Sequence, residues 1–334
     1  MIDVQNLTKH YGPVTAIRDV SFSVEPGQII GFLGPNGAGK STTMRILSCF
    51  MPASTGTARV AGFDVFSESL EVRRRIGYLP ESVPLYSELR VADYLDFVAE
   101  VKGVGRAQRK ARVGEVMERC HIDDVSRRMI GKLSKGYRQR VGLAQAIVSD
   151  PAVLILDEPT IGLDPQQITE IRALIKSLAG DHTVILSTHI LPEVSMICQG
   201  VVIINRGSIV AQGPIDRLVE EFFPTARVHV QVAGPSAAVR EGLGRIPGVV
   251  DVHDELTGDG LASYVVESAR GHDLRGEIFQ LAAQQHWELR ELRRAGMTLE
   301  EVFIRIVAGE EAEAERAADA TPTPDAPPPA ETPA

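Results

Sequence analysis

Aromatic residues and cysteines are scarce in this sequence. Phe, Trp and Tyr make up 5% of the 334 residues, so Ala, Val, Leu and Ile must fill most of the core. The three cysteines, Cys49, Cys120 and Cys198, lie far apart and form no C-x-x-C pair. This spacing argues against a disulfide framework and against a zinc site, and it fits a reducing compartment.

Long hydrophobic runs and a basic excess are also missing. Nowhere do eighteen apolar residues follow one another, and the segment from Met1 to His10 lacks the basic and apolar regions of a secretory signal. Any membrane role is therefore expected to come through a partner. The formal net charge of −9 argues against a nucleic-acid partner, because such proteins normally carry a basic stripe.

The length and the composition predict more than one domain. A chain of 334 residues is about twice the usual length of one domain. The segment from Gly309 to Ala334 holds seven acidic residues against one basic residue and is rich in Ala and Pro. With so little to bury, it is predicted to be disordered. We expect a first domain over 1–222, an accessory domain over 223–308 and a disordered acidic tail over 309–334.

The strongest local pattern is an apolar strand that leads through a glycine-rich turn into a helix. Residues 28–33 (QIIGFL) precede GPNGAGKS at 34–41, and a helical pattern follows. In this context G-x-x-x-x-G-K-[ST] predicts a phosphate-binding loop. Backbone N–H groups would wrap the β-phosphate, the lysine would bridge the β- and γ-phosphates, and the serine would offer its hydroxyl to Mg²⁺. These groups belong to Gly37, Ala38, Gly39, Lys40 and Ser41.

Two further apolar strands end in polar residues. Residues 153–156 run into Asp157 and Glu158, and residues 183–187 run into Thr188 and His189. Uniformly apolar strands suit a parallel sheet with both faces covered, whose ligands bind beyond the carboxyl ends of the strands. Asp157 would hold Mg²⁺, and Glu158 would orient an attacking water or accept its proton. Hydrolysis is therefore favoured over transfer to a substrate hydroxyl.

The rest of the chain completes an α/β fold class. Residues 1–26 alternate as in an antiparallel flank, and about 85–147 is mostly helical, which predicts a helical subdomain inserted into the parallel sheet. After about 223 the order strand-helix-strand-strand-helix-strand predicts a small ferredoxin-like α+β domain, with a last helix near 299–307.

Six motifs in order resemble those of an ATP-binding cassette (ABC) transporter ATPase. They are Tyr11, the loop at 34–41, LSKGY at 133–137, LILDEP at 154–159, GLD at 162–164 and His189. The resemblance covers about residues 2–218 and is to the single-cassette subunits that serve ABC-2-type exporter permeases. It implies a P-loop NTPase with a RecA-like sheet, ATP and Mg²⁺ as ligands, and ATP hydrolysis that powers a separate integral membrane permease from the cytoplasmic face of the cell membrane.

The resemblance also implies residue roles. Tyr11 would stack on adenine, and His189 would hold the γ-phosphate and the attacking water. Ser134 and Gly136 would contact the γ-phosphate bound by another subunit, so a homodimer, or a pair with a paralogous ABC subunit, would close head-to-tail with Asp164 at the junction. The remaining implied ATP-binding residues are Asn36, Gly37, Ala38, Gly39, Lys40, Ser41 and Thr42.

Two positions depart from the family pattern. Glu81 stands where the family usually has Gln; its carboxylate can still bind Mg²⁺ but adds negative charge near the γ-phosphate. Lys135 and Tyr137 stand where Gly and Gln are usual. Lys135 could offset the triphosphate charge, or it could be a solvated surface lysine.

Three other functions use some of the same motifs. A non-transport ABC ATPase of translation or DNA repair usually has two cassettes in one chain or a long coiled-coil insertion, and neither is seen here. A phosphotransferase shares the glycine-rich loop but not the signature at 133–137 or His189. A purely regulatory nucleotide binder is disfavoured by the joint presence of Lys40, Asp157, Glu158 and His189. We therefore expect the ATPase subunit of a transporter, and a non-transport ABC ATPase is the alternative.

Overall fold

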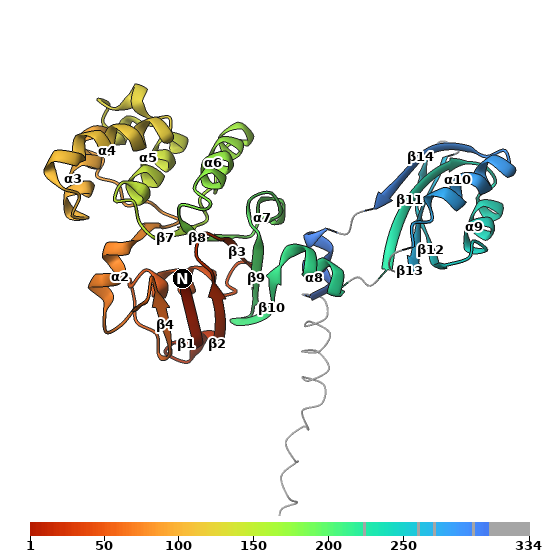
Figure 1. Ribbon diagram of the computed structural model, residues 1–334, viewed down its shortest axis with the longest axis horizontal. Coiled ribbons are helices and arrows are strands. Elements are labelled where there is room, and N and C mark those ends of the chain that lie inside the picture. Colours follow the sequence, from red (N-terminus) through yellow and green to blue (C-terminus); the bar gives the residue numbers. More distant parts are fainter. Residues whose placement is uncertain (223–224, 259–260, 270–271, 296–297, 307–334) are drawn as a thin grey trace, which may run out of the picture.

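Two units, each built around its own core, make up the computed structural model, which describes residues 1–222, 225–258, 261–269, 272–295 and 298–306 (Figure 1). We call 1–222 the N-terminal unit and 225–295 the C-terminal unit. The predicted tail at 309–334 lies outside the described residues.

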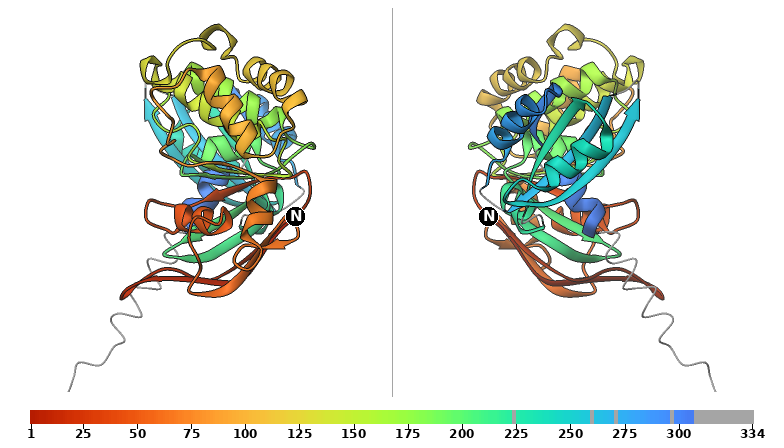
Figure 2. Two further views of the ribbon diagram at one scale, coloured as in Figure 1. Left: turned by 90° about the vertical axis from the view of Figure 1, so that its left-hand side faces the viewer. Right: turned by 90° about the vertical axis from the view of Figure 1, so that its right-hand side faces the viewer.

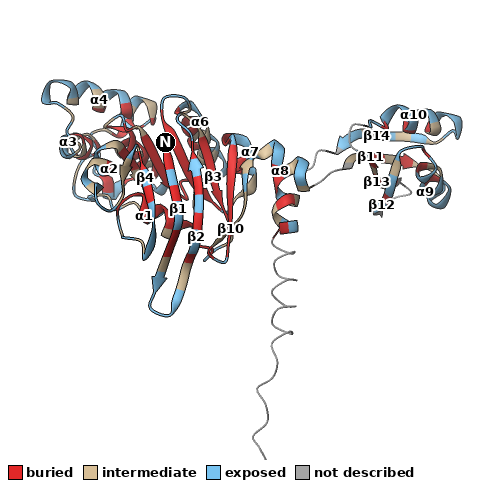
Figure 3. Cartoon of the chain, turned by 60° about the horizontal axis from the view of Figure 1, so that its bottom comes forward, coloured by how far each residue is buried: buried red, intermediate tan, exposed pale blue. Residues whose placement is uncertain are grey.

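A six-stranded sheet forms the centre of the N-terminal unit. Its order is β10-β9-β3-β8-β7-β6, and all strands are parallel except the edge strand β10. Every residue of β3, β7 and β8 is buried, as expected for parallel strands covered on both faces (Figure 3). The strands are β3 (Ile29–Leu33), β6 (Ile76–Leu79), β7 (Val153–Asp157), β8 (Thr183–Thr188), β9 (Gly200–Asn205) and β10 (Ser208–Pro214).

A four-stranded sheet in the order β2-β1-β4-β5 packs against the central sheet and confirms the predicted antiparallel flank. The two sheets share one hydrophobic cluster, in which the rings of Phe22 and Phe32 lie 5.4 Å apart between centroids. The strands are β1 (Ile2–Tyr11), β2 (Val14–Val24), β4 (Thr55–Val60) and β5 (Phe63–Asp64).

The predicted helical insertion lies between β6 and β7. In side view its helices occupy the end of the molecule opposite the antiparallel sheet (Figure 2). It contains α3 (Val91–Val101), α4 (Arg106–Arg119), α5 (Lys135–Ile147) and the short 3₁₀ turns η1 (Asp123–Val125) and η2 (Ile130–Lys132). The other helices of the N-terminal unit are α1 (Lys40–Leu47), α2 (Ser69–Arg75), α6 (Pro165–Ser177), α7 (Leu191–Ile197) and α8 (Ile215–Phe222).

The C-terminal unit has the predicted strand-helix-strand-strand-helix-strand order. Its antiparallel sheet has the order β12-β13-β11-β14, and α9 and α10 pack onto a separate core that includes Val230, Tyr264 and Ile278. The elements are β11 (Thr225–Ala233), α9 (Ser236–Gly244), β12 (Val249–Gly258), β13 (Leu261–Ala269), α10 (Arg275–Gln284) and β14 (Glu288–Ala295).

The helix at 299–306 packs differently from the expectation that it belongs to the accessory domain at 223–308. Leu299, Val302 and Ile306 are buried in the same cluster as Leu218 of α8, and the core of the C-terminal unit contains none of them. Arg305 also donates to the carbonyl oxygen of Phe222 at 2.9 Å. The apolar stripe of this helix therefore completes the N-terminal unit, and the C-terminal unit is inserted between α8 and this helix.

Candidate functional site

The phosphate loop joins β3 to α1, as the sequence predicts. Gly39 precedes α1 with a φ of 109°, and a Cβ there would lie 2.5 Å from a side-chain methyl carbon of Ile17. A side chain at this position would therefore clash as well as strain the backbone. No side chain caps the start of α1, so its first N–H groups remain directed at the loop, which is the arrangement that binds phosphate at helix N-termini.

Lys40 places a buried positive charge inside this loop. Its ammonium donates to the carbonyl oxygens of Gly34 at 2.8 Å and Pro35 at 3.2 Å, and it lies 3.6 Å from Glu158 Oε1. The side chain is 6% exposed. These contacts hold the cation where the loop would enclose a phosphate group.

Ser41 and Asp157 meet at the carboxyl end of the central sheet. Ser41 Oγ donates to Asp157 Oδ1 at 3.2 Å, and the hydroxyl of Ser187 donates to the same oxygen. A hydroxyl beside a buried carboxylate is a donor set that Mg²⁺ accepts when phosphates supply further oxygens. The described side chains contain no cluster of three His, Cys, Asp or Glu residues suited to a metal.

The buried charge of Asp157 also acts on a neighbouring residue of β6. Burial, reinforced by the charge of Asp157, raises the pKa of Tyr78 to about 12.

Glu158 and His189 lie side by side next to the lysine. The His189 Nδ1 atom is 2.9 Å from Glu158 Oε2 and 3.1 Å from Glu158 Oε1. The N–H of Glu158 donates to both the carbonyl and the hydroxyl oxygen of Ser187, which fixes a backbone φ of 50°. The Glu158 side chain is 7% exposed and that of His189 is 41% exposed. A carboxylate held in this way can orient a water molecule or accept its proton.

Ser134 precedes α5 as its N-cap, and Gly136, in the first turn, lies against α6 of the same chain. The Ser134 hydroxyl caps α5 by accepting from the N–H of Tyr137 at 3.3 Å. A Cβ at Gly136 would lie 2.3 Å from Gln167 Oε1, so the glycine leaves room for that side chain. Lys135 lies over Gly162, where a Cβ would approach Lys135 Nζ to 1.9 Å. Among the described residues, no hydrogen bond or ion pair joins Ser134 or Gly136 to the phosphate loop of their own chain.

Tyr11 and Glu81 lie outside the cluster of contacting site residues. Tyr11 ends β1, is 44% exposed and donates through its hydroxyl to Met51 Sδ at 3.0 Å. Glu81 is exposed just beyond β6, whose last residue Leu79 is paired with Leu156 at the strand end that carries Asp157. Within the described part of the chain, Glu81 makes no hydrogen bond or ion pair. The contacting set is Lys40, Ser41, Asp157, Glu158 and His189.

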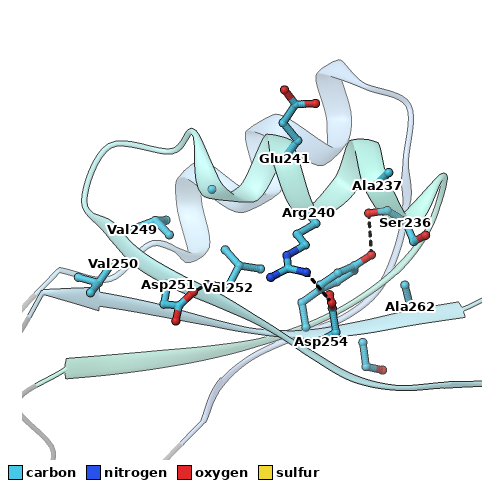
Figure 4. Close-up of a pocket in the computed structure, with 13 residues that line it drawn as sticks. Ser236, Ala237, Arg240, Glu241, Val249, Val250, Asp251, Val252, Asp254 and Ala262 are labelled. Atoms are coloured by element: carbon cyan, nitrogen blue, oxygen red, sulfur yellow. Dashed lines mark hydrogen bonds and ion pairs between the residues drawn. The ribbon is translucent and has the colours of Figure 1, made fainter.

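A cavity of about 750 Å³ lies in the C-terminal unit, between α9 and the strands β12 and β13 (Figure 4). Two pairs of its polar wall groups are bonded to each other: Arg240 pairs with Asp254 at 3.0 Å, and the Tyr264 hydroxyl donates to the carbonyl oxygen of Ser236 at 3.1 Å. The glycine-rich loop and the groups it gathers all lie in the N-terminal unit, so the candidate site is there.

Comparisons with known proteins decide the family. A family model described as "ABC transporter" matches residues 17–161. The chain is 30% identical to a linearmycin resistance ATP-binding protein of Bacillus subtilis and 31% identical to a bacitracin transport ATP-binding protein of Bacillus licheniformis, over 92% of this chain and 98% of each relative. The chain belongs to the ATP-binding subunits of ABC transporters.

Other relatives agree with this assignment. A Nod factor export ATP-binding protein of Burkholderia orbicola is 32% identical over 92% of this chain and 97% of its own length. A solved ATP-binding subunit of an ABC transporter, 29% identical, has a TM-score of 0.62 and covers 66% of this chain and 93% of the solved chain. A dimeric cassette with bound ADP and phosphate has a TM-score of 0.60 and covers 64% of this chain and 98% of its own; at 23% identity it shows the fold alone.

Membership confirms the function expected from the sequence at the family level. The ABC subunit binds ATP and is an ATPase coupled to transport, and subunits of this kind dimerise and work with a membrane permease. No helix in the described ranges of this ABC subunit is long and apolar enough to cross a membrane.

Two residues at the site were missed by sequence reasoning. Ser187 appeared only as part of an apolar strand, yet its hydroxyl contacts Asp157 and the N–H of Glu158. Glu193 received no role from the sequence, yet it is fully buried. A serine inside a strand that is otherwise apolar was the available signal for the first, because buried polar groups must be hydrogen-bonded. Nothing local in the sequence marks Glu193 as buried.

Proposed function

We propose that this ABC subunit binds ATP with Mg²⁺ between two cassettes and drives export through a separate ABC-2-type permease, from the cytoplasmic face of the cell membrane. The contact set of Lys40, Glu158 and His189 beside the phosphate loop carries the hydrolytic part of the proposal. The names of relatives that act in drug resistance, bacitracin transport and Nod factor export support the export part.

The polar groups divide the work at the phosphate end. Lys40 would leave its carbonyl partners for the β- and γ-phosphates, while the loop N–H groups hold the nucleotide. Glu158 would orient the attacking water, and His189, already bonded to Glu158, would hold it near the γ-phosphate. Bound Mg²⁺ would offset phosphate charge, and we propose Ser41, Asp157 and Glu81 as the residues that hold it.

The outer part of the nucleotide needs groups that lie elsewhere. The half-exposed ring of Tyr11 offers a surface for adenine, and Asn36 and Thr42 flank the loop groups that face the phosphates. Ser134 and Gly136 would complete the site of a second subunit, which is a copy of this chain or a paralogous ABC subunit.

Replacement of Glu158 by Gln tests the hydrolytic assignment. The amide keeps the size of the side chain but cannot accept a proton, and loss of a general base slows a reaction roughly 10²- to 10⁴-fold. We expect phosphate release to fall by at least about 10²-fold while a fluorescent ATP analogue still binds. Glu118→Gln, on the exposed side of α4, is the matched control and should retain parental activity. Parental turnover in Glu158→Gln would refute the assignment.

Ser134→Arg tests the divided site. A long cation at the start of α5 should block closure onto the partner's nucleotide and abolish turnover. The isolated subunit should still bind the analogue, because Ser134 does not contact its own phosphate loop. Loss of nucleotide binding by a folded monomeric variant would show that Ser134 contacts the nucleotide of its own subunit, and would refute the divided site.

Copurification of the tagged subunit from membranes separates a transporter from a non-transport ABC ATPase. An integral membrane protein should copurify in stoichiometric amount and should stimulate ATP hydrolysis. A subunit that remains wholly separate from the membrane fraction of the cells that naturally express it would favour the alternative.

A further inference from the structure

A fully buried carboxylate lies beneath the hydrolytic residues. Glu193, in the first turn of α7, has no exposed surface. Its Oε2 atom accepts from Thr160 Oγ1 at 2.9 Å and from Thr188 Oγ1 at 3.1 Å, and its Oε1 atom accepts from Arg172 Nη2 at 3.1 Å. A buried carboxylate is tolerated only when it is paired and hydrogen-bonded, and this one is both.

The two threonines belong to the two loops that carry the hydrolytic side chains. Thr160 is two residues beyond Glu158, and Thr188 immediately precedes His189. One carboxylate oxygen thus accepts a hydrogen bond from each loop. The Glu158–His189 hydrogen bond of 2.9 Å requires the two loops to keep a fixed spacing. The carboxylate of Glu193, which accepts from both loops, holds them at that spacing.

The segments that carry the two threonines are anchored by further hydrogen bonds. Thr188 Oγ1 accepts from the N–H of Ile190 at 3.0 Å, so the same hydroxyl spans the backbone on both sides of His189. Pro159, between Glu158 and Thr160, accepts at its carbonyl oxygen from Gln139 Nε2 of α5 at 2.8 Å. The two hydroxyl groups therefore link Glu193 to short segments whose backbone positions are fixed by these further hydrogen bonds.

Arg172 makes the arrangement electrostatically tolerable. Glu193 adds a third buried carboxylate to Asp157 and Glu158 at this edge of the sheet. The guanidinium of Arg172, on α6, supplies the opposite charge at 3.1 Å and also reaches Met196 Sδ of α7 at 3.7 Å. The cation thus supplies the charge partner of Glu193 and joins α6 to α7.

We propose that Glu193 is a positioning residue for ATP hydrolysis, which acts through Thr160 and Thr188 to hold Glu158 and His189 in register. This inference rests on the hydrolytic roles proposed for those two residues. Glu193 touches neither nucleotide nor water in the proposed site. A loss of its hydrogen bonds should lower kcat and leave ATP binding unchanged.

The test compares full-length variants that each lose one part of the network. Thr160→Val and Thr188→Val remove one hydroxyl each at nearly constant shape, and Glu193→Gln removes the charge. Their kcat and KM for ATP, the Kd for a fluorescent ATP analogue and the Tm are measured. We expect kcat to fall at least about tenfold, which corresponds to about 1.4 kcal/mol of transition-state stabilisation, with KM and Kd within about twofold.

Thr183→Val is the matched control. Thr183 is buried in the same strand, at the end away from the site, and its hydroxyl accepts one backbone hydrogen bond, from Gly27 at 3.0 Å. The Thr183→Val variant therefore loses one buried hydrogen bond and leaves the hydrogen bonds to Glu193 intact. Its kcat should stay within about twofold of that of the parent. An equal loss of kcat in this control would attribute the effect to general packing and overturn the proposal.

The remaining outcomes are also decisive. Parental kcat in both Thr160→Val and Thr188→Val overturns the proposal, and these two variants decide it if Glu193→Gln fails to fold. Should the parent itself fail to hydrolyse Mg²⁺-ATP, the proposed function fails, and the ring ¹⁵N NMR signals of His189 become the deciding measurement. They should shift towards those of an unbonded imidazole in Thr188→Val; unchanged signals would overturn the inference.

Discussion

The helix at 299–306 offers a sharp test of how the two units are connected. Leu299 is 2% exposed and lies in the hydrophobic cluster of the N-terminal unit, although the C-terminal unit separates it from that unit in the sequence. If this packing is right, truncation of Leu299 must weaken the N-terminal unit. If the helix belonged to the C-terminal unit, the same truncation would weaken that unit instead.

The expected magnitude follows from the burial of the side chain. Leu→Ala at a buried position costs about 2–5 kcal/mol, because transfer free energy is lost and a cavity remains. For a domain of 150–250 residues, each kcal/mol shifts Tm by about 2–4 °C. Leu299→Ala should therefore lower the unfolding transition of the N-terminal unit by roughly 4–20 °C. Ile304 is on the same helix and is 60% exposed, so Ile304→Ala should change stability by no more than about 0.5 kcal/mol.

Scanning calorimetry with and without Mg²⁺-ADP identifies which unit is affected. A bound nucleotide raises only the transition of the unit that binds it, which marks the N-terminal unit without any assumption about the order of melting. We expect Leu299→Ala to lower the nucleotide-sensitive transition. A decrease confined to the nucleotide-insensitive transition, or equal decreases in Leu299→Ala and Ile304→Ala, would refute the packing argument.

Three further predictions concern the ends and edges of the fold. Glu81→Gln should keep ATPase activity, whereas Glu81→Ala should weaken Mg²⁺-dependent turnover or its stimulation by the permease. If Glu81→Ala matched the parent in both the Mg²⁺ dependence and the stimulation by the permease, Glu81 would not belong to the metal site. A chain that ends at Gly309 keeps the helix at 299–306, so its free energy of unfolding should lie within about 0.5 kcal/mol of that of the parent. A large drop in Tm would contradict this. Hydrogen bonds from Ser67 and Phe66 hold the pKa of Asp64 below 3.8. The parent should therefore be more stable than Asp64→Asn above pH 3.8, and this advantage should disappear as the pH falls through the lowered pKa. Urea unfolding at a series of pH values measures the difference, and a difference that does not change with pH would contradict the prediction.

The phosphate loop could be predicted because its determinants are local. A strand, a glycine-rich turn and a lysine at the start of a helix are contiguous, and parallel strands bring Asp157 and His189 to the same sheet edge. The order of the strands could not be predicted in the same way. β8 lies between β3 and β7, although β7 precedes it in the sequence. That order is what brings Ser187 onto Asp157, and it depends on long-range packing.

Packing partners were the other part that the sequence could not supply. The spacing of Leu299, Val302 and Ile306 predicts a helix with one buried face, but an apolar stripe does not say which surface covers it. The return to α8 depends on the distance between the two ends of the inserted unit, where Arg227 of β11 pairs with Ala295 of β14. Glu193 is a similar case, since its burial depends on three partners from three other segments.

The divided site can be examined inside a single chain through Gly136. A Cβ at this position would lie 2.3 Å from Gln167 Oε1, and the three nearest atoms all belong to the end of that flexible side chain. Gly136→Ala should therefore fold by displacing Gln167, at a cost that Gln167→Ala in the same chain would relieve. The same Cβ would still project from the start of α5, where the proposed partner nucleotide is contacted.

The double variant Gly136→Ala with Gln167→Ala therefore separates the two explanations for this glycine. If Gly136 is needed only for contact with α6, the double variant should recover both Tm and kcat. If Gly136 is needed for close approach to the partner's γ-phosphate, Tm should recover and turnover should stay low. We expect the second result, with Gln167→Ala alone as the control for any loss at α6. Full recovery of turnover would show that the glycine serves the packing of α5 on α6, and the proposed contact with the partner's nucleotide would then rest on Ser134 alone.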